Sequence, residues 1–482
     1  MRVLLVRPHP ELRVAQVLQK GFLNLEPLDL EIVAGGVPDE DNVSILDLSL
    51  EKQPFDALRR EVSANKPDFI GFTGYSSHAR MIKKLAGICK EILPGATTIV
   101  GGIHATIAAA DYRTPDIDIV VRGEGGTAMR DLVARFKAGK SLHCENRAIS
   151  TKHPDFQSLA DSPPPMYPSW DQVPRPRRNI VKRSRYFSVW TSSPTQRLES
   201  MFPQVATLRT SVGCAFTCSF CVVHYMLHRK YLERTPEDVV DEIAGLSENH
   251  IYFVDDEMFL NPVRITRIAE MLIERNIKKQ YISWARSDTI VRHPEVFRLW
   301  KKAGLSTVYV GIVAMYYEQL ADYNNKTNTA TNRHAVQVLK DIGITLHASF
   351  LVNPDFTVEK FQRLEKEIST LTPAEVTFTV MSPPPGTPLW HQHKHEFICD
   401  PYLFYDCMHT LLKTALPLPR FYAHFSHLYS LAMRANPLRV NRIRVPLREL
   451  GRAMYMGTKY VLAFRAIYRD YENHEYRPDH PG

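Results

Sequence analysis

The run Ser211-Val-Gly-Cys214-Ala-Phe-Thr-Cys218-Ser-Phe-Cys221 decides how the rest of the chain is interpreted. Its three cysteines follow a C-x3-C-x2-C pattern and come directly after a strand-like run, Val205–Thr210. Three thiolates this close in sequence converge on one metal centre only if the chain between them forms a compact loop, and Gly213 supplies the backbone freedom for it. The stretch therefore predicts a metal-binding loop between a strand and a helix.

The number of cysteines favours an iron-sulfur cluster. A structural zinc site uses four protein ligands, whereas a [4Fe-4S] cluster held by three cysteines leaves one iron open to another ligand. Three ordinary buried thiols, or a zinc site completed by His224 or His228, remain the alternatives. Because the spacing occurs together with a strand before it and a helix after it, we expect Cys214, Cys218 and Cys221 to hold a cluster.

Length and composition set the class of protein. The 482 residues suffice for two or three domains, and 44% hydrophobic with 23% charged residues is ordinary for a soluble globular protein. The net charge of +8 is mildly basic. It supports a nucleic-acid surface only weakly, because anionic substrates, cofactor phosphates or an acidic membrane surface explain it equally well. We expect no nucleic-acid partner.

Cysteine use and the N-terminus indicate the compartment. Seven cysteines, three of them clustered, do not form a disulfide framework and predict a reducing environment. The N-terminal run is a short strand ended by charge and proline, unlike a signal peptide. No apolar run approaches the roughly 20 residues of a membrane span. We expect a cytoplasmic protein that touches membranes at most peripherally.

Residues 1–140 predict a doubly wound α/β domain, because short apolar runs alternate with helical stretches. Each expected strand ends in a polar or glycine-rich loop, and in open parallel sheets ligands bind at this edge. No G-x-G-x-x-G motif follows the first strand, which disfavours a nicotinamide or flavin dinucleotide. The expected strands are Arg2–Val6, Val43–Leu46, Phe69–Thr73, Thr98–Val100 and Ile117–Val121.

Residues 204–390 predict a partial or full parallel (β/α) barrel, in which the residues that leave the strands carry the chemistry. A helix should begin at Pro236 with Thr235 as its N-cap. The expected strands are Ile251–Val254, Tyr281–Ala285, Thr307–Val310, Leu346–Leu351 and Glu375–Val380.

Two further segments complete the predicted organisation. Residues 141–203 are rich in proline and arginine and predict an extended linker, whose basic residues we expect on a solvated face or, failing that, against phosphate-like cofactor groups. Residues 391–482 carry aromatic and basic helical stretches. Such stretches predict helices packed on the barrel, with a membrane surface or an apolar substrate groove as the alternative.

The cysteine loop resembles that of radical S-adenosylmethionine (SAM) enzymes, which also place an aromatic, here Phe220, before the last cysteine. In that family the open iron chelates SAM, and an electron from the cluster splits SAM into methionine and a 5'-deoxyadenosyl radical. The resemblance implies that strand-end residues hold SAM: Phe220, Asp255, Asp256, Arg286, Asp288 and Gly311. The family commonly shows Gly-x-Glu after its fourth strand; here Val313 replaces the glutamate, which puts this part of the ribose contact in doubt.

The N-terminal loops resemble the cobalamin-binding domain found before many radical SAM modules. The Asp-x-His-x-x-Gly signature is absent, so the resemblance implies cobalamin with its own base displaced and no protein histidine beneath cobalt. For His104, a helix cap is an equal alternative. The implied cobalamin-binding residues are Ser76, Ser77, Gly101, Gly102, His104, Gly123 and Glu124.

The combination of both modules suggests a cobalamin-dependent radical SAM methyltransferase acting on an unactivated carbon. Residues 250–425 are most similar to hopanoid C-3 methylases, in runs such as Phe253–Phe259 and Phe404–His409, which suits an apolar or lipid substrate. An electron donor such as flavodoxin or ferredoxin is expected. Radical cyclisation or rearrangement without methyl transfer, an iron-sulfur nucleic-acid modifier, and a cobalamin sensor with a degenerate barrel are the alternatives.

Overall fold

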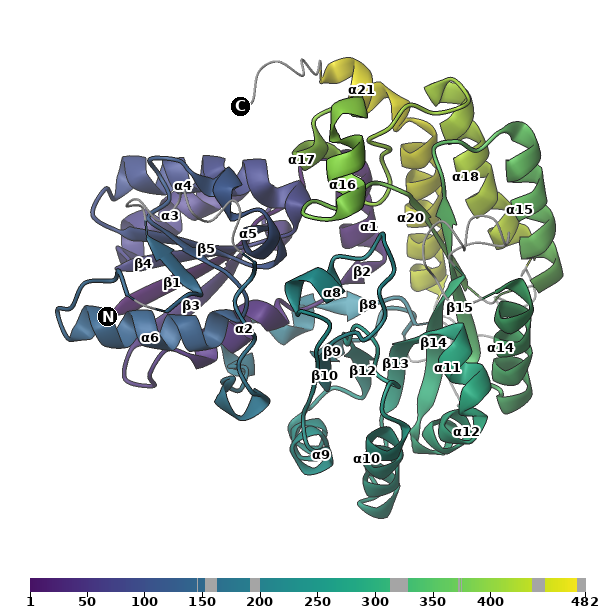
Figure 1. Cartoon of the computed structure of the whole chain (residues 1–482), viewed down its shortest axis with the longest axis horizontal. Coiled ribbons are helices and arrows are strands. Elements are labelled where there is room, and N and C mark those ends of the chain that lie inside the picture. The colour runs from purple at the N-terminus through teal and green to yellow at the C-terminus, as the bar shows by residue number, and fades with distance from the viewer. Residues whose placement is uncertain are drawn as a thin grey trace.

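The computed structural model describes residues 1–144, 146–151, 163–190, 200–312, 328–371, 373, 375–435 and 447–474. Two α/β domains lie side by side, and the C-terminal helices pack against the second domain (Figure 1). Each domain is organised around one six-stranded sheet. The predicted fold class, a doubly wound domain followed by a partial barrel and a helical C-terminal region, is therefore confirmed.

The N-terminal sheet has the order β3-β1-β4-β5-β6-β7 and is parallel except for β7, which runs antiparallel to β6. Its strands are β1 (Arg2–Arg7), β3 (Asn42–Asp47), β4 (Phe69–Thr73), β5 (Thr97–Gly101), β6 (Ile119–Val121) and β7 (Ile149–Thr151). Its main helices are α2 (Leu28–Gly35), α3 (Pro54–Asn65), α4 (Ala79–Ile92), α5 (Ile103–Ile107) and α6 (Gly125–Lys137).

Helices cover both faces of this sheet, which is why its strands are continuous apolar runs. Leu5 and neighbouring strand residues pack with α2 and α6, whereas Leu4 and Val6 pack with α3 and α4. At the start of α6 the Glu124 carboxylate accepts hydrogen bonds from the backbone N–H groups of Gly126 and Thr127, both at 2.7 Å. This cap fixes the glycine-rich loop at the strand edge.

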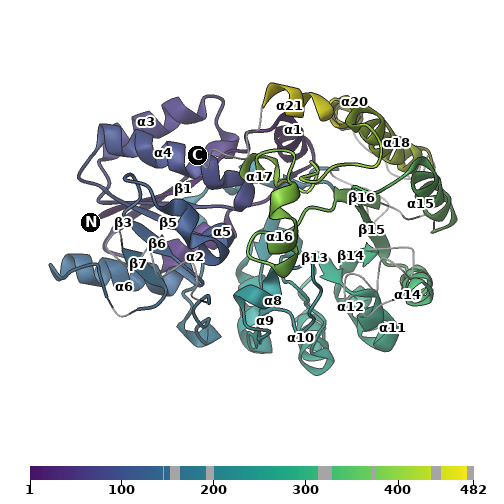
Figure 2. The same ribbon diagram turned by 45° about the horizontal axis from the view of Figure 1, so that its top comes forward.

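The second sheet has the order β16-β15-β14-β13-β12-β9, all parallel, and it curls into a half barrel with helices on its convex side (Figure 2). Its strands are β9 (Val205–Leu208), β12 (His250–Phe253), β13 (Gln280–Ala285), β14 (Leu305–Ile312), β15 (Thr345–Val352) and β16 (Glu375–Val380). Its helices are α9 (Pro236–Gly245), α10 (Pro262–Glu274), α11 (Ser287–Arg292), α12 (Pro294–Ala303), α14 (Thr329–Ile342) and α15 (Val358–Leu371).

The predicted start of α9 is confirmed, since Thr235 Oγ1 accepts a hydrogen bond from Asp238 N. All the predicted strands are present, with ends that differ by one or two residues at most positions. Ile117 and Asp118 precede β6 because the Asp118 backbone and side chain both bond Thr98 at the start of β5. The division of the chain into segments 1–140, 141–203, 204–390 and 391–482 stays a prediction.

Segments from both ends of the chain continue the helical layer of the barrel. Helix α1 (Arg13–Gly21) contacts α20 (Leu447–Arg465), and Val14 lies in the barrel core rather than in the N-terminal core. Figure 2 shows α18, α20 and α1 in sequence around the rim. The remaining elements here are β2 (Leu23–Asn24), β8 (Phe187–Ser188), α16 (Pro388–His393), α17 (Pro401–Phe404), α18 (Leu418–Ala435) and α21 (Tyr468–Asn473). Among the described residues no helix is long and apolar enough to cross a bilayer.

Two linker arginines, Arg178 and Arg183, are not on a solvated face, which corrects the sequence-based prediction, whereas Arg175 is exposed as predicted. Arg178 pairs with Glu26 at 2.7 Å and with Glu242 at 2.6 Å, and Arg183 pairs with Glu26 at 2.6 Å and with Glu248. Glu26 belongs to the N-terminal segment, while Glu242 and Glu248 belong to the barrel. Buried carboxylates require partner cations, so the linker arginines join the two domains.

Candidate active site

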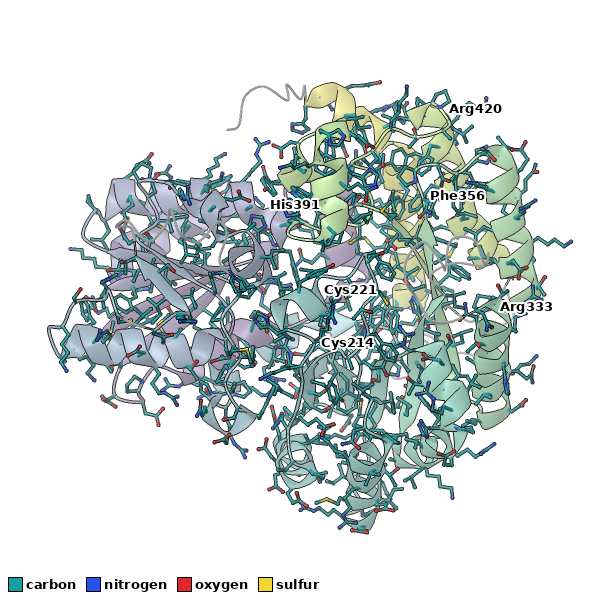
Figure 3. The ribbon with its side chains drawn as sticks, viewed as in Figure 1. Cys214, Cys221, Arg333, Phe356, His391 and Arg420 are labelled. Carbon is teal, nitrogen blue, oxygen red and sulfur yellow. The ribbon has the colours of Figure 1, made fainter. Side chains whose placement is uncertain are left out.

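The cysteine loop begins in a short hairpin at the end of the barrel. Strand β10 (Ser211–Gly213) pairs antiparallel with β11 (Tyr231–Glu233), and α8 (Val223–Met226) follows the last cysteine. Gly213 has a φ of +98°, and a Cβ there would lie 2.1 Å from the Lys230 carbonyl oxygen. Only glycine fits this position. Figure 3 shows Cys214 and Cys221 near the middle of the molecule, where the barrel faces the N-terminal domain.

Two carboxylates after β12 hold the start of this loop. Asp255 accepts hydrogen bonds from Thr210 N at 3.1 Å, from Thr210 Oγ1 at 2.7 Å and from Ser211 Oγ at 2.5 Å. Asp256 Oδ2 accepts one from Gly213 N at 2.8 Å. The Asp255 carboxylate is thus occupied by hydrogen bonds within the protein. Asp256 bonds Gly213 through Oδ2, which leaves Oδ1 for another partner, and its side chain lines the cavity between the two domains.

The three cysteines lie on one short loop and are buried or partly buried. Burial raises the pKa of Cys214 to about 11 and that of Cys221 to about 12. That they hold a cluster stays a prediction. No group of three His, Cys, Asp or Glu in the described part of the chain is gathered tightly enough for one metal ion. In a cluster each cysteine binds a different iron, which permits wider spacing.

The zinc alternative gains no support from the histidines. His228 Nε2 lies 2.7 Å from the Pro164 carbonyl oxygen and is exposed, on a turn where His228 and Arg229 both have positive φ. His224 is buried and stacks on Tyr225. Neither histidine joins the cysteines in a group that fits a metal ion.

Arg286, at the end of β13, reaches the cysteine loop. Its guanidinium lies 3.7 Å from the centre of the Phe216 ring, and Nη1 is 3.7 Å from Cys218 Sγ. Asp288 Oδ1 accepts from Arg286 Nε at 2.9 Å and fixes the guanidinium plane. The structure therefore brings Arg286, with Asp288 bonded to it, to the cysteine loop, and that the two residues hold SAM stays a prediction.

Glu257 is a site residue that the sequence analysis did not single out. It is fully buried beside the loop; its Oε2 accepts from Arg286 N at 3.0 Å, and its Oε1 has no hydrogen-bond partner among the described residues. Burial raises the pKa of Glu257 to about 8 despite the opposing charge of Arg286. An unpaired buried carboxylate oxygen is costly unless a cation meets it. In the sequence, Glu257 could have been found from its position directly after Asp255 and Asp256 at the end of a predicted strand.

A cavity lies between the two domains, and about 190 Å³ of it admits the centres of water-sized molecules. The N-terminal domain contributes the edges of β4, β5 and β6, including Gly101, Gly102, Gly123 and Glu124. The barrel contributes Arg209, Val212 and Asp256 together with four residues that follow the last cysteine: Val222, Val223, Met226 and Leu227. The cysteine loop and the glycine-rich loops therefore meet across one cavity.

One part of the cavity is an apolar slot beside α2 and α6, lined by Leu5, Leu30, Ile99, Val121 and Met129. Gly71 keeps this slot open, because a Cβ there would lie 2.9 Å from the Leu5 side chain. Among the described residues that line the cavity there is no histidine. The slot is apolar, as ligand pockets usually are, and cobalamin bound with its own base displaced stays a prediction.

Other predicted site residues lie elsewhere. His104 is fully buried, 3.1 Å from Ser76 Oγ and 3.2 Å from Asp111 Oδ2, and its ring contacts Tyr112 and Tyr402. His104 neither caps a helix nor lines the cavity, and Ser76 does not line it either. Neither residue is therefore proposed as a cofactor contact.

The remaining residues predicted for the site differ in where they lie. Ser77 is half-buried on the turn after β4 and does not line the cavity. Phe220 is in the cysteine loop and Gly311 near the end of β14, as expected. Val313 lies outside the described residues.

Comparison with protein families agrees with both domains. The B12 binding domain family matches residues 17–133, and the radical SAM superfamily matches residues 208–368. The first match covers β3, β4, β5 and β6 of the N-terminal sheet, and the second covers β12, β13, β14 and β15.

Individual relatives extend the agreement. Hopanoid C-3 methylase from Methylococcus capsulatus is 29% identical over 428 residues, covering 88% of this chain and 78% of its own length. Anaerobic magnesium-protoporphyrin IX monomethyl ester cyclase from Rubrivivax gelatinosus is 29% identical over 369 residues, covering 74% of this chain and 64% of its own length.

Solved structures share the fold. The cobalamin-dependent S-adenosylmethionine radical enzyme OxsB has a TM-score of 0.69 at 16% identity, covering 97% of this chain and 72% of its own. The radical S-adenosylmethionine methyltransferase TsrM from Kitasatospora setae has a TM-score of 0.65 at 16% identity, covering 98% of both chains.

Proposed function

Since this chain belongs to the cobalamin-dependent radical SAM enzymes, we propose that it transfers a methyl group to an unactivated carbon of a small apolar, lipid-like molecule. The observation that carries the proposal is the interdomain cavity, because its walls come from the cysteine-loop side of the barrel and from the glycine-rich loops of the B12-binding domain. Cofactors bound there supply the radical and the methyl group, and the protein aligns them.

We assign the cysteine side of the site to SAM. Cys214, Cys218 and Cys221 hold the cluster. The Arg286 guanidinium, oriented by Asp288 and Phe216, binds the carboxylate of SAM, and the free Glu257 oxygen accepts from its ammonium group. Asp256 contacts SAM across the cavity, while Asp255 supports the loop. Gly311 and Phe220 stay predicted contacts.

The cavity side belongs to cobalamin. Gly101, Gly102 and Gly123 allow close approach of backbone, and Glu124 orders the loop before α6. The apolar residues Val212, Val222 and Val223 exclude water from the space between the two cofactors. Arg209 also lines this cavity, where its guanidinium pairs with the Asp29 carboxylate at 3.1 Å and adds a positive charge to the wall.

An aromatic row on the inner barrel wall supports a flat apolar substrate. Tyr309 is stacked between Trp284, with ring centres 4.5 Å apart, and His347, at 3.8 Å. His347 is held by Glu375 at 3.0 Å and by Thr377 at 2.6 Å. Trp284 is 37% exposed, so its ring is accessible. Aromatic faces bind extended apolar ring systems through area and stacking. The name of the Methylococcus relative points to the same chemical class.

The test is anaerobic reconstitution with iron, sulfide, cobalamin and SAM, followed by turnover with a reductant and lipid extracts. We expect equal formation of 5'-deoxyadenosine and S-adenosylhomocysteine and a product heavier by one methylene. Formation of 5'-deoxyadenosine alone would instead favour radical cyclisation, which the name of the Rubrivivax relative keeps as the second candidate. Flavodoxin or ferredoxin as the natural reductant, and a cytoplasmic location, stay predictions.

A further inference from the structure

Helix α20 carries an exposed surface that the proposed reaction does not use. Its inner side packs on the barrel layer through Tyr460, Ala463 and Phe464. Its outer side presents Met454, Tyr455 and Leu462, which are 65%, 59% and 58% exposed. Scattered single exposed apolar residues are ordinary, but three large ones on one helical face are not. We call this face, together with the cations Arg448, Arg452, Lys459 and Arg465 that flank it, the α20 surface.

Cations border the apolar residues in a regular order. At 100° per residue, Tyr455 and Leu462 lie on one line, and Arg448, Arg452 and Lys459 lie along one flank of it. Arg465 lies beside Met454 on the opposite flank. Lys459 Nζ is 4.7 Å from the centre of the Tyr455 ring, and the Arg452 guanidinium is 4.3 Å from that of Phe202. The aliphatic stems therefore extend the apolar surface while the charged ends remain accessible.

Helix α20 itself is basic. It contains four basic residues, Arg448, Arg452, Lys459 and Arg465, and one acidic residue, Glu449. The Glu449 carboxylate accepts a hydrogen bond from Met201 N at 2.7 Å, so the one negative group is turned to the protein.

We propose that the α20 surface binds an anionic lipid bilayer peripherally, with Met454, Tyr455 and Leu462 in the headgroup region and the flanking cations on lipid phosphates. A basic amphipathic helix with exposed aromatic and aliphatic residues has the composition of an interfacial helix. A second copy of this chain is a poorer partner, because a two-fold interface would bring the same cations together. Figure 2 shows α20 on the outer rim beside α18, where it can meet a flat surface.

The experiment is flotation of the full-length protein with vesicles of phosphatidylcholine alone and of an equal mixture with phosphatidylglycerol, at low and high salt. We expect binding to the anionic vesicles that weakens with salt. The double variant Lys459→Glu/Arg465→Glu should lower the partition coefficient at least about tenfold, because each basic residue near an anionic surface contributes severalfold. Tyr455→Ser/Leu462→Ser should lower it by a similar factor, and with a weaker dependence on salt.

The controls separate the helix from general surface effects. Val263→Ser removes an equally exposed apolar residue on α10, and Lys140→Glu/Lys278→Glu reverses two exposed charges elsewhere. Both should bind as the unsubstituted protein does, and melting temperatures should match throughout. Absence of vesicle binding, binding unaffected by both α20 variants, or a protein dimer that these variants dissociate would each overturn the proposal.

Discussion

The two walls of the interdomain cavity are built by different means. On the barrel side, the lining residues are supported from behind by charged and polar side chains that do not themselves line the cavity: Asp255 fastens the cysteine loop, and Asp288 fastens Arg286. On the B12-binding side, glycine backbone and apolar side chains make up most of the wall, with Gly71 and Gly102 closely approached by their neighbours, and the polar residues Asp29, Thr73, Thr106 and Glu124 complete it. One wall is therefore damaged by removing side chains, and the other is damaged by adding them.

This difference reflects what each wall has to bind. The reacting groups on the barrel side need fixed donors and acceptors, which only side-chain networks orient. A large corrin with an aromatic tail needs space and close backbone approach more than directed bonds. Substitutions on each wall, with matched controls, test whether the contrast holds.

The largest effect is expected on the barrel side, at the cysteines. Cys214→Ala, Cys218→Ala and Cys221→Ala should each abolish the cluster absorbance and all SAM cleavage, while cobalamin binding remains. Cys144→Ala, in the other domain, should retain both. Iron content, visible spectra and 5'-deoxyadenosine formation are the measurements, and cleavage retained by any of the first three variants would contradict the cluster assignment.

A large effect is also expected at Asp255. Asp255→Ala leaves Thr210 and Ser211 without their shared acceptor, at a cost of about 1–3 kcal/mol for each buried group left unsatisfied. Most of the cluster should be lost on purification. Asp256→Asn keeps an oxygen for Gly213 N, so it should retain the cluster and weaken SAM binding instead. Equal iron content in the two variants would show that Asp255 does not support the loop.

The junction itself should depend on Arg178. Arg178→Ala leaves the buried Glu31 without its ion-pair partner and leaves Glu26 paired with Arg183 alone, and the loss of unfolding free energy should be about 3–5 kcal/mol. Arg175→Ala breaks an exposed pair with Asp238 and should cost below about 1 kcal/mol. Urea unfolding midpoints measure both variants. Similar midpoints would mean that the linker pairs are not what joins the domains.

Away from the cavity, His409 should make stability depend on pH. Burial opposes its charge, but Asp406 at 2.9 Å and Asp470 at 3.1 Å outweigh burial and raise the pKa of His409 to about 9. Because the pKa of His409 is higher in the folded than in the unfolded state, its protonation stabilises the fold fully below the unfolded-state pKa of about 6.5. This stabilisation is lost as pH rises through about 9. The contribution is on the order of 2–3 kcal/mol.

The corresponding measurement is thermal denaturation of the unsubstituted protein and of His409→Gln between pH 6 and 10. The difference in melting temperature between the two proteins should be largest at the acidic end and shrink as pH rises. A difference that stays constant across this range would exclude a charged His409 in the folded state.

The smallest effect is expected on the glycine wall. Gly102 has a φ of +96°, and an added Cβ would lie 2.8 Å from Thr73 Oγ1 at the cavity edge. Gly139 also has a positive φ, +65°, but nothing lies within 4 Å of an added Cβ. Both alanine variants carry a strain of about 1 kcal/mol, but only Gly102→Ala should weaken cobalamin binding, by roughly tenfold. Equal binding, measured by the cobalamin absorbance, would place the cofactor elsewhere.

The sequence predicted what depends on local order. The predicted strands, the Thr235 cap and the cysteine loop follow from runs of adjacent residues, and all are present. Strand β7 was not predicted, because Ile149–Thr151 lies in the segment assigned to an extended linker. Asp255 was assigned to SAM because it follows a strand; the structure instead commits it to Thr210 and Ser211, some forty positions earlier in the chain. Position at a strand end indicates the neighbourhood of a side chain but not its partner.

Long-range pairings lay beyond prediction for the same reason. The linker arginines looked solvated because their partners, Glu26 and Glu248, are far away in sequence. His104 looked like a cofactor contact because it lies in a glycine-rich loop, although Asp111 and Tyr402 enclose it. Glu257 was overlooked because burial, the property that makes it notable, is not visible in a sequence.

The most direct measurement concerns the distance between the two cofactors. Electron paramagnetic resonance of the reconstituted protein, with cobalamin as cob(II)alamin and the cluster reduced, reports magnetic coupling between cobalt and iron. If one cavity joins the cysteine loop to the glycine loops, the two signals should be broadened or split by each other, and the coupling should vanish in Cys214→Ala. Two signals that simply add, with no coupling in the intact protein, would contradict a shared site.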